Sequence, residues 1–296
     1  MTPQRKRNLF LLIAFAIVIL TAAVFKLCGG QYQSPYGTAI ATFCMLAPMI
    51  SMMIVQAMAH EPLFRSIGIS WKVNRWWFVG WLIIPVGAIA ALGINILMPG
   101  SQFSTHTPLV EQALEQMAAS GLHTNAFGLA AVTTVSGLFA GATINALFAF
   151  GEESGWRGFL LQQMKHEKFL KVALFTGVVW GLWHAPLILL GHNYPAHPVA
   201  GVAMMVLFCV AMTPLITYIR IKSHSVIAAA IVHGTTNALF GLSIPFLLAY
   251  NDLLAGIAGL GSIVALLIAD AALYLYDRYV SRQHIFTSVI APHLEQ

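Results

Sequence analysis

Eight apolar stretches, each of about 20 residues, follow one another along the 296-residue chain and constrain its fold more than any other feature. They cover residues Leu9 to Leu27, Gly37 to Met58, Trp76 to Met98, Phe127 to Met164, Val172 to Leu190, Val199 to Ile221, Val226 to Leu248 and Leu253 to Tyr276. Charged residues make up only 8% of the chain, against about 25% in soluble proteins. The sequence therefore predicts an all-α polytopic membrane protein with about eight transmembrane helices, in the plasma membrane if the source is bacterial.

The lysines and arginines predict the orientation of these helices, because cytoplasmic loops carry the excess of positive charge. Basic residues lie before the first stretch and after the second, fourth, sixth and eighth, at Arg5, Lys6, Arg7, Arg65, Lys72, Arg75, Lys165, Lys168, Lys171, Arg220, Lys222, Arg278 and Arg282. All of these segments fall on one side, so both termini are expected in the cytoplasm and residues 1–296 form a single integral-membrane domain. The net charge of +5 reflects this topology and does not indicate a nucleic-acid partner.

The longest loop on the opposite side, Pro99 to Ala126, contains a helix signal. Thr107 can cap the helix and Pro108 suits its first turn, and an apolar stripe then ends near Gly121. We expect a short helix on the outer surface, either as a solvated loop element or as a lid.

The fourth apolar stretch is too long for one straight transmembrane helix. Its 38 residues, from Phe127 to Met164, would extend about 57 Å, whereas the apolar core of a bilayer is about 30 Å thick. The helix must bend, tilt or protrude. Glycines that can break it or allow close approach of neighbouring helices occur at Gly137, Gly141, Gly151 and Gly155.

Charged and polar residues interrupt three of the apolar stretches. The motifs are Gly151-Glu152-Glu153-Ser154-Gly155-Trp156-Arg157, Trp180-Gly181-Leu182-Trp183-His184 and His233-Gly234-Thr235-Thr236-Asn237. Ionisable side chains at bilayer depth are costly and usually paired or functional. Residues four apart share one face of a helix, which places Glu153 beside Arg157. We expect the motifs to meet near the midplane in a polar cavity that opens toward the cytoplasm.

The order Glu-Glu-x-x-x-Arg, aromatic-x-x-x-His and His-x-x-x-Asn resembles the CPBP family, the CAAX proteases and bacteriocin-processing enzymes. The matching residues are Glu152, Glu153, Arg157, Trp180 where phenylalanine is common, His184, His233 and Asn237. The resemblance covers Ala140 to Phe240, within an expected catalytic core at 127–242. It implies an intramembrane endopeptidase that acts on protein or peptide substrates, with or without a lipid, and in one branch on prenylated C-terminal motifs.

The chemistry assigns separate roles to these residues. Glu152 with His184 can activate water, while His233 and Asn237 can stabilise the oxyanion of a tetrahedral intermediate. Adjacent residues on a helix project about 100° apart, so Glu153 is assigned to an ion pair with Arg157 and Glu152 to catalysis. Trp180 is interpreted as a packing or cavity-wall residue, and His192 and His197 as loop residues.

Three alternatives stay open. A divalent metal such as zinc could be held by Glu152, Glu153, His184 and His233, but the chain lacks the H-E-x-x-H pattern, and we favour metal-free catalysis. Intramembrane carboxylates and histidines also build the proton relays of ion-coupled transporters. A non-catalytic immunity or scaffold protein could retain the same fold.

Overall fold

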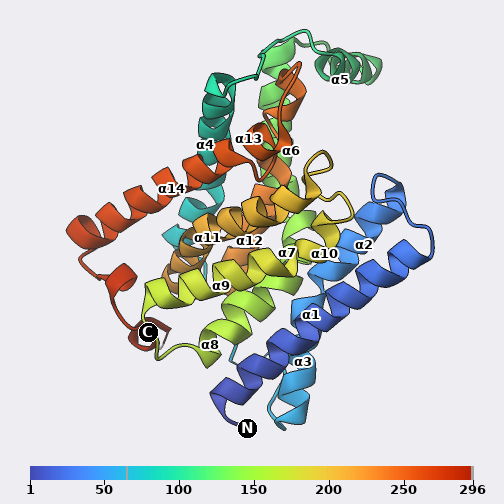
Figure 1. Ribbon diagram of the computed structural model, residues 1–296. Coiled ribbons are helices and arrows are strands. Elements are labelled where there is room, and N and C mark those ends of the chain that lie inside the picture. The colour runs from blue at the N-terminus through green and yellow to red at the C-terminus, as the bar shows by residue number, and fades with distance from the viewer. Residues whose placement is uncertain (65, 295–296) are drawn as a thin grey trace.

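A computed structural model describes residues 1–64 and 66–294 of the chain (Figure 1). The protein is 73% helical, and the described residues form no β-strand. The helical elements in chain order are α1 (Pro3–Leu27), α2 (Pro35–Met45), α3 (Ala47–Met58), α4 (Arg75–Leu97), α5 (Pro108–Ala119), α6 (Ala126–Ala142), α7 (Ile144–Glu153), η1 (Ser154–Leu160), α8 (Leu161–Gln163), α9 (Phe169–Trp183), α10 (Ala185–Ile188), α11 (Pro198–Ser223), α12 (Val226–Leu239), η2 (Ile244–Phe246), α13 (Asp252–Ala255), α14 (Leu260–Leu275), η3 (Tyr276–Ser281), η4 (Ile285–Thr287) and α15 (Ala291–Leu294).

Within the described part of the chain, seven helical segments are long and apolar enough to cross a membrane. They are α1, α2 with α3, α4, α9 with α10, α11, α12 continued to Phe246, and Asp252–Ser281. An eighth candidate, Ala126–Ala142 with Ile144–Gln163, is a pair of helices bent by 48°. The prediction of an all-α, multi-pass integral membrane protein with about eight spans is confirmed.

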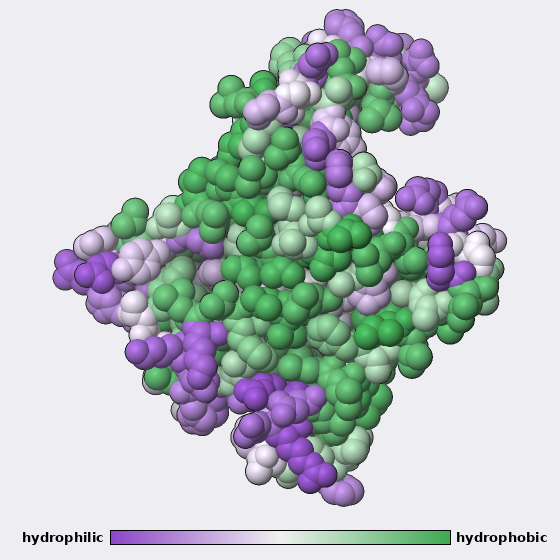
Figure 2. All heavy atoms as spheres, viewed as in Figure 1, coloured by the Kyte–Doolittle hydropathy of each residue, from purple (hydrophilic) through white to green (hydrophobic). Residues whose placement is uncertain are grey.

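The outer surface of the bundle is apolar where it would face lipid. On α4, the large side chains of Phe78, Leu82, Val86 and Ile89 recur every three or four residues and are between 48% and 65% exposed. Figure 2 shows apolar side chains covering the middle of the visible face, with hydrophilic residues gathered toward its edges. Such a surface would be unfavourable in water and matches the hydrocarbon core of a bilayer.

The basic segments are brought together by contacts between distant parts of the chain. Lys6 near the N-terminus pairs with Glu61 after α3. The Asn74 side chain donates to the carbonyl of Lys222 at 3.1 Å, and Lys222 donates to Gln283 at 2.5 Å. Arg65 lies outside the described residues. One end of the bundle therefore carries the basic loops, while their location in the cytoplasm stays a prediction.

The bend in the fourth span is confirmed, but its position differs from the glycines that suggested it. The chain turns at Thr143, between α6 and α7, where φ is −119° and ψ is −94°. Gly141 instead permits close packing, since a Cβ atom there would lie 2.5 Å from the Cα atom of Thr235. A Cβ atom at Gly234 would likewise lie 2.5 Å from the carbonyl oxygen of Gly141. The glycines hold α12, which carries His233, against the bent span.

The expected surface helix is also present, as α5. The Thr107 hydroxyl accepts a hydrogen bond from the backbone N–H of Val110 at 3.1 Å, and Pro108 occupies the first turn. Val110 packs in a small apolar cluster with Leu129 of α6 and Phe246 of η2. The helix is thereby attached to the end of the bundle opposite the basic loops (Figure 1); its predicted function, lid or solvated element, remains a prediction.

Candidate active site

Glu152 is the second-to-last residue of α7, which continues into the π-helical segment η1. Its side chain is only 2% exposed. One carboxylate oxygen, Oε2, accepts a hydrogen bond from the indole N–H of Trp180 on α9 at 2.6 Å. Short π-helical segments occur often at functional sites, because the extra residue per turn redirects the side chains around it.

Glu153 points to a different set of partners. Its Oε1 atom accepts hydrogen bonds from Nη1 of Arg157 at 3.0 Å and from Nδ1 of His233 at 2.8 Å. Arg157 also donates to the hydroxyl of Thr213 at 3.0 Å, and its guanidinium lies 4.4 Å from the ring centroid of Trp180. The predicted Glu153–Arg157 pair is confirmed. The contact with His233 was not predicted and gives Glu153 a link to the second histidine.

His184 lies where α9 ends and α10 begins. The backbone N–H of His184 bonds to the carbonyl of Gly181, so the Trp180 carbonyl is available to the His184 side chain. Nδ1 of the ring lies 2.8 Å from that carbonyl oxygen. A carbonyl only accepts hydrogen bonds, so Nδ1 carries a proton there, and in the neutral ring Nε2 is left as the proton acceptor.

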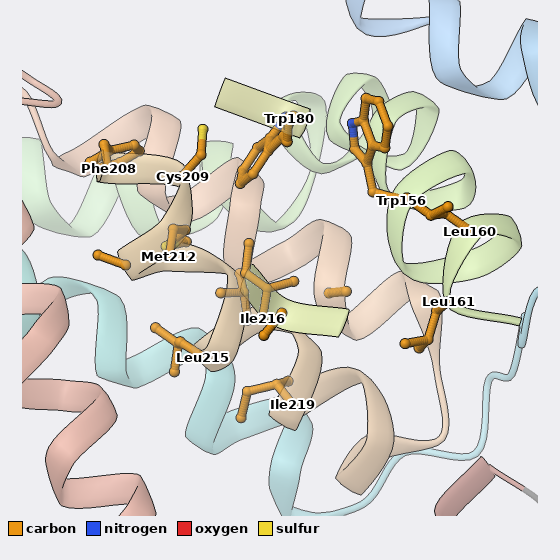
Figure 3. Packing of buried hydrophobic residues seen from close by; sticks show 14 of the residues in the cluster. Trp156, Leu160, Leu161, Trp180, Phe208, Cys209, Met212, Leu215, Ile216 and Ile219 are labelled. Atoms are coloured by element: carbon orange, nitrogen blue, oxygen red, sulfur yellow. The ribbon is translucent and has the colours of Figure 1, made fainter. Parts of the chain in front are cut away.

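The three motifs share one cavity of about 260 Å³ inside the bundle. Polar side chains that line it come from α7, α9 and α12 and are Glu152, Trp180, His184, His233, Thr236 and Asn237. Phe208, Cys209 and Met212 of α11 form part of its apolar wall, and Figure 3 shows them near Trp180. The structure thus brings together the four residues predicted to be catalytic and places the Glu153–Arg157 pair behind them.

Asn237 differs from the other residues of the cavity in its exposure. Glu152 and His233 are buried, whereas Asn237 is exposed, and no described residue makes a hydrogen bond with its side chain. Its amide is therefore free to bind a group that enters the cavity.

Trp180 was interpreted as a packing or cavity-wall residue; it lines the cavity, and its indole also bonds to Glu152. The signal was present in the sequence, because a buried indole N–H normally requires an acceptor and phenylalanine, common at this position, has none. Trp180 also touches both histidines, with ring centroids 5.7 Å from His184 and 5.2 Å from His233. It therefore orients the Glu152 carboxylate and packs between the other two motifs.

His192 lies in the loop between α10 and α11, as predicted, but it also belongs to the site, which was not predicted. His192 lines the cavity, and its ring is stacked parallel to that of His184 with centroids 6.5 Å apart. Nδ1 of His192 lies 2.6 Å from the hydroxyl of Tyr32. Burial, with the nearby His184, lowers the pKa of His192 to about 3. The ring is therefore neutral at physiological pH.

His197 is likewise more than a loop residue. Its Nδ1 lies 2.5 Å from Oδ1 of Asp252, and Oδ2 of the same carboxylate accepts the backbone N–H of Ala196 at 2.9 Å. These contacts attach the loop between α10 and α11 to α13. Nothing in the residue spacing could have indicated a contact between segments 55 residues apart.

The donor set proposed for a metal is not assembled. Among the described residues, no group of three or more His, Cys, Asp or Glu side chains is arranged to hold a metal ion. Oε1 of Glu153 is already shared by Arg157 and His233, and the same contact occupies Nδ1 of His233. These contacts oppose the set of Glu152, Glu153, His184 and His233, so no step is assigned to a metal.

The cavity also opens at the end opposite to the one predicted. Beyond Glu152 and the histidines, its lining continues to His192 and Asn193, between α10 and α11, and to Ala41 of α2. These segments lie at the end of the bundle that carries no basic loop. The prediction that the cavity opens toward the basic loops is therefore wrong.

Comparison with known proteins identifies the relatives of this chain. A family model described as type II CAAX prenyl endopeptidase Rce1-like matches residues 134–239, which include all three motifs. CAAX prenyl protease 2 of Methanococcus maripaludis is 29% identical over 141 residues, 45% of this chain and 48% of the relative. The match thus spans about half the length of the curated relative, and neither comparison favours a transporter. Both similarities agree with the resemblance of the three motifs to the CPBP family, the CAAX proteases and bacteriocin-processing enzymes.

Proposed function

We propose that the protein is an intramembrane endopeptidase that hydrolyses a peptide bond with water activated by Glu152 and His184. The observation that carries this proposal is the convergence of Glu152, His184, His233 and Asn237 on one cavity within a bundle of membrane-spanning helices. The family relationship supports the same class of reaction.

The base is Glu152, acting with His184. Trp180 holds Oε2 of Glu152, and no described residue bonds to Oε1, which is free to accept a proton from water. His184 presents Nε2 as a second acceptor, since Nδ1 donates to a carbonyl. As the water oxygen attacks the carbonyl carbon, its proton passes to this pair. The proton is then delivered to the leaving nitrogen when the carbon–nitrogen bond breaks.

His233 and Asn237 stabilise the oxyanion of the tetrahedral intermediate. The Asn237 amide has two N–H donors and no described partner. Because Nδ1 of His233 donates to Glu153, an N–H on the other nitrogen requires the imidazolium ring. With that ring charged, the two carboxylates Glu152 and Glu153 are balanced by Arg157 and His233. A net charge of zero suits a site within the membrane.

Glu153, Arg157 and Trp180 position the reacting groups. Glu153 fixes the ring of His233, and Arg157 holds Glu153 in place. Trp180 fixes the Glu152 carboxylate from the other side of the cavity. Each of these contacts is within hydrogen-bond distance and removed from water, where such bonds orient side chains strongly.

The test is cleavage of a peptide library by the purified protein in lipid nanodiscs. Glu152→Gln keeps the size of the side chain and an acceptor for Trp180 but removes the base, so turnover should fall by at least about 100-fold. Glu167→Gln, the same exchange at a surface pair with Lys171, is the matched control and should keep its activity. Chelator treatment of the unsubstituted protein tests the metal alternative in the same assay. Equal cleavage by Glu152→Gln and the unsubstituted protein would refute the proposal.

A further inference from the structure

A second cavity continues the first toward the loops at the non-basic end. Its volume is about 510 Å³, and it shares Ala41, Met45, His192, Asn193 and Ile257 with the cavity that contains Glu152. Its remaining lining comes mainly from the segment before α2, the α10–α11 loop and the segments flanking α13, and includes Tyr32, Gln33, Ser34, Pro195, Tyr250 and Asp252. Together the two cavities form a passage from the candidate active site to the end of the bundle without basic loops.

The opposite direction is closed by packed side chains. Trp156, Phe159 and Leu160 of η1, which follow Glu152 toward the basic loops, are each at most 1% exposed. Phe10 of α1 packs on two of them, with ring centroids 5.3 Å from Trp156 and 5.2 Å from Phe159. Figure 3 shows Trp156, Leu160 and Leu161 along the same helical segment. Close packing of this kind leaves no room for a peptide between Glu152 and the basic end.

The passage suits a segment without charge. No lysine or arginine lines either cavity among the described residues. Of the acidic side chains in the lining, Glu152 is the base and Asp252 is held by His197 and a backbone N–H. The low pKa of His192 keeps that ring neutral as well. A charged residue of a substrate would thus lose its hydration and find no free counter-charge.

Flexible apolar side chains provide the wall beside the reacting groups. Met45, Met205, Met212 and Phe208 line the inner cavity. Methionine adapts its shape to differing apolar partners, so this wall can accept various large side chains next to the bond that is cut.

We propose that the substrate is an uncharged, largely apolar peptide segment that reaches Glu152 from the membrane face opposite the basic loops, between the Tyr32–Ser34 segment and the α10–α11 loop. By the distribution of basic residues this is the extracytoplasmic face. The inference rests on the proposed function, because it takes the reaction to be peptide hydrolysis. The direction of access can be tested without any peptidase activity.

Direction of access can be measured by labelling cysteines with a membrane-impermeant maleimide. Cys28, exposed after α1, marks the non-basic face in the natural chain. In a Cys28→Ser background, Asn193→Cys reports on the passage, His123→Cys on the same face away from it, and His166→Cys on a basic loop. In intact cells Asn193→Cys and His123→Cys should react and His166→Cys should not, with the pattern reversed in inverted vesicles. The inference would be overturned if Asn193→Cys reacted from the same face as His166→Cys. It would also be overturned if Asn193→Cys reacted from neither face.

Cleavage then tests the occupant of the passage. A quenched fluorogenic peptide joined to a hydrophilic polymer, which cannot cross the bilayer, should be cut by right-side-out vesicles and not by sealed inverted ones. Replacing an apolar residue beside the cut bond by lysine or aspartate should lower kcat/KM at least about tenfold. Labelled Asn193→Cys should lose cleavage, while labelled His123→Cys should keep it.

The two proposals fail in different ways. Cleavage confined to inverted vesicles overturns the direction of access and leaves the endopeptidase intact. Absence of cleavage even after detergent opens the vesicles removes the endopeptidase, and the maleimide pattern still decides the direction of access.

Discussion

Substitution by glutamine should distinguish the two adjacent carboxylates, because Glu153→Gln should destabilise the protein more than Glu152→Gln does. Glu153 is completely buried and shares Oε1 between Arg157 and His233, while no described residue bonds to its Oε2 atom. Arg157 is 1% exposed, so the loss of the Glu153 charge leaves a buried cation without its counter-ion. The same substitution at Glu152 removes a charge that makes no direct ion pair with a described residue, and it keeps an oxygen for the indole of Trp180.

The expected effect follows from the burial of the pair. Removing one partner of a buried ion pair typically costs about 3–5 kcal/mol. Glutamine keeps one acceptor oxygen for Arg157, so we expect the lower end for Glu153→Gln, about 3 kcal/mol, and about 1 kcal/mol or less for Glu152→Gln. At about 2–4 °C per kcal/mol, Glu153→Gln should lower Tm by about 6–12 °C.

The measurement is thermal unfolding of both variants in one detergent, followed by a double-mutant cycle. Arg157→Met removes the cation with little change in volume, so Glu153→Gln with Arg157→Met should be less destabilised than the sum of the single variants. Turnover of folded Glu153→Gln should also fall, because His233 loses its charged partner. Equal Tm shifts for Glu152→Gln and Glu153→Gln, or strict additivity in the cycle, would refute the assignment of the ion pair.

Three further outcomes are expected. Trp180→Phe removes the donor to Glu152 while keeping the ring, so kcat should fall about tenfold with Tm nearly unchanged; an unchanged kcat would contradict the role of that bond. The pKa of His192 is about 3 in the folded protein against 6.5 normally, so the unfolded chain binds more protons between these values and stability falls as the pH is lowered from 6.5; His192→Gln should weaken this pH dependence of Tm. Gly155→Ala would place a Cβ atom 2.5 Å from a proline of α3 and should cost about 1–3 kcal/mol in unfolding free energy, whereas Gly93→Ala, with open space around it, should not destabilise.

The sequence alone was sufficient for features that depend on local composition and spacing. The apolar spans could be located because a bilayer requires about 20 apolar residues per helix. The surface helix was predicted from a cap at Thr107, and the pairing of Glu153 with Arg157 from their separation of four residues. Each of these properties is determined by neighbours within one or two helical turns.

The tertiary structure decided which distant residues meet. His233 bonds to Glu153 across 80 residues, and His192 lies beside Tyr32 across 160. The bend at Thr143 and the opening of the cavity at the non-basic end also depend on how whole helices cross and rotate. Hydropathy is nearly uniform around these helices, so the pattern of apolar residues does not specify their rotation. Packing of small residues such as Gly141 against Thr235 does, and that contact exists only in the assembled bundle.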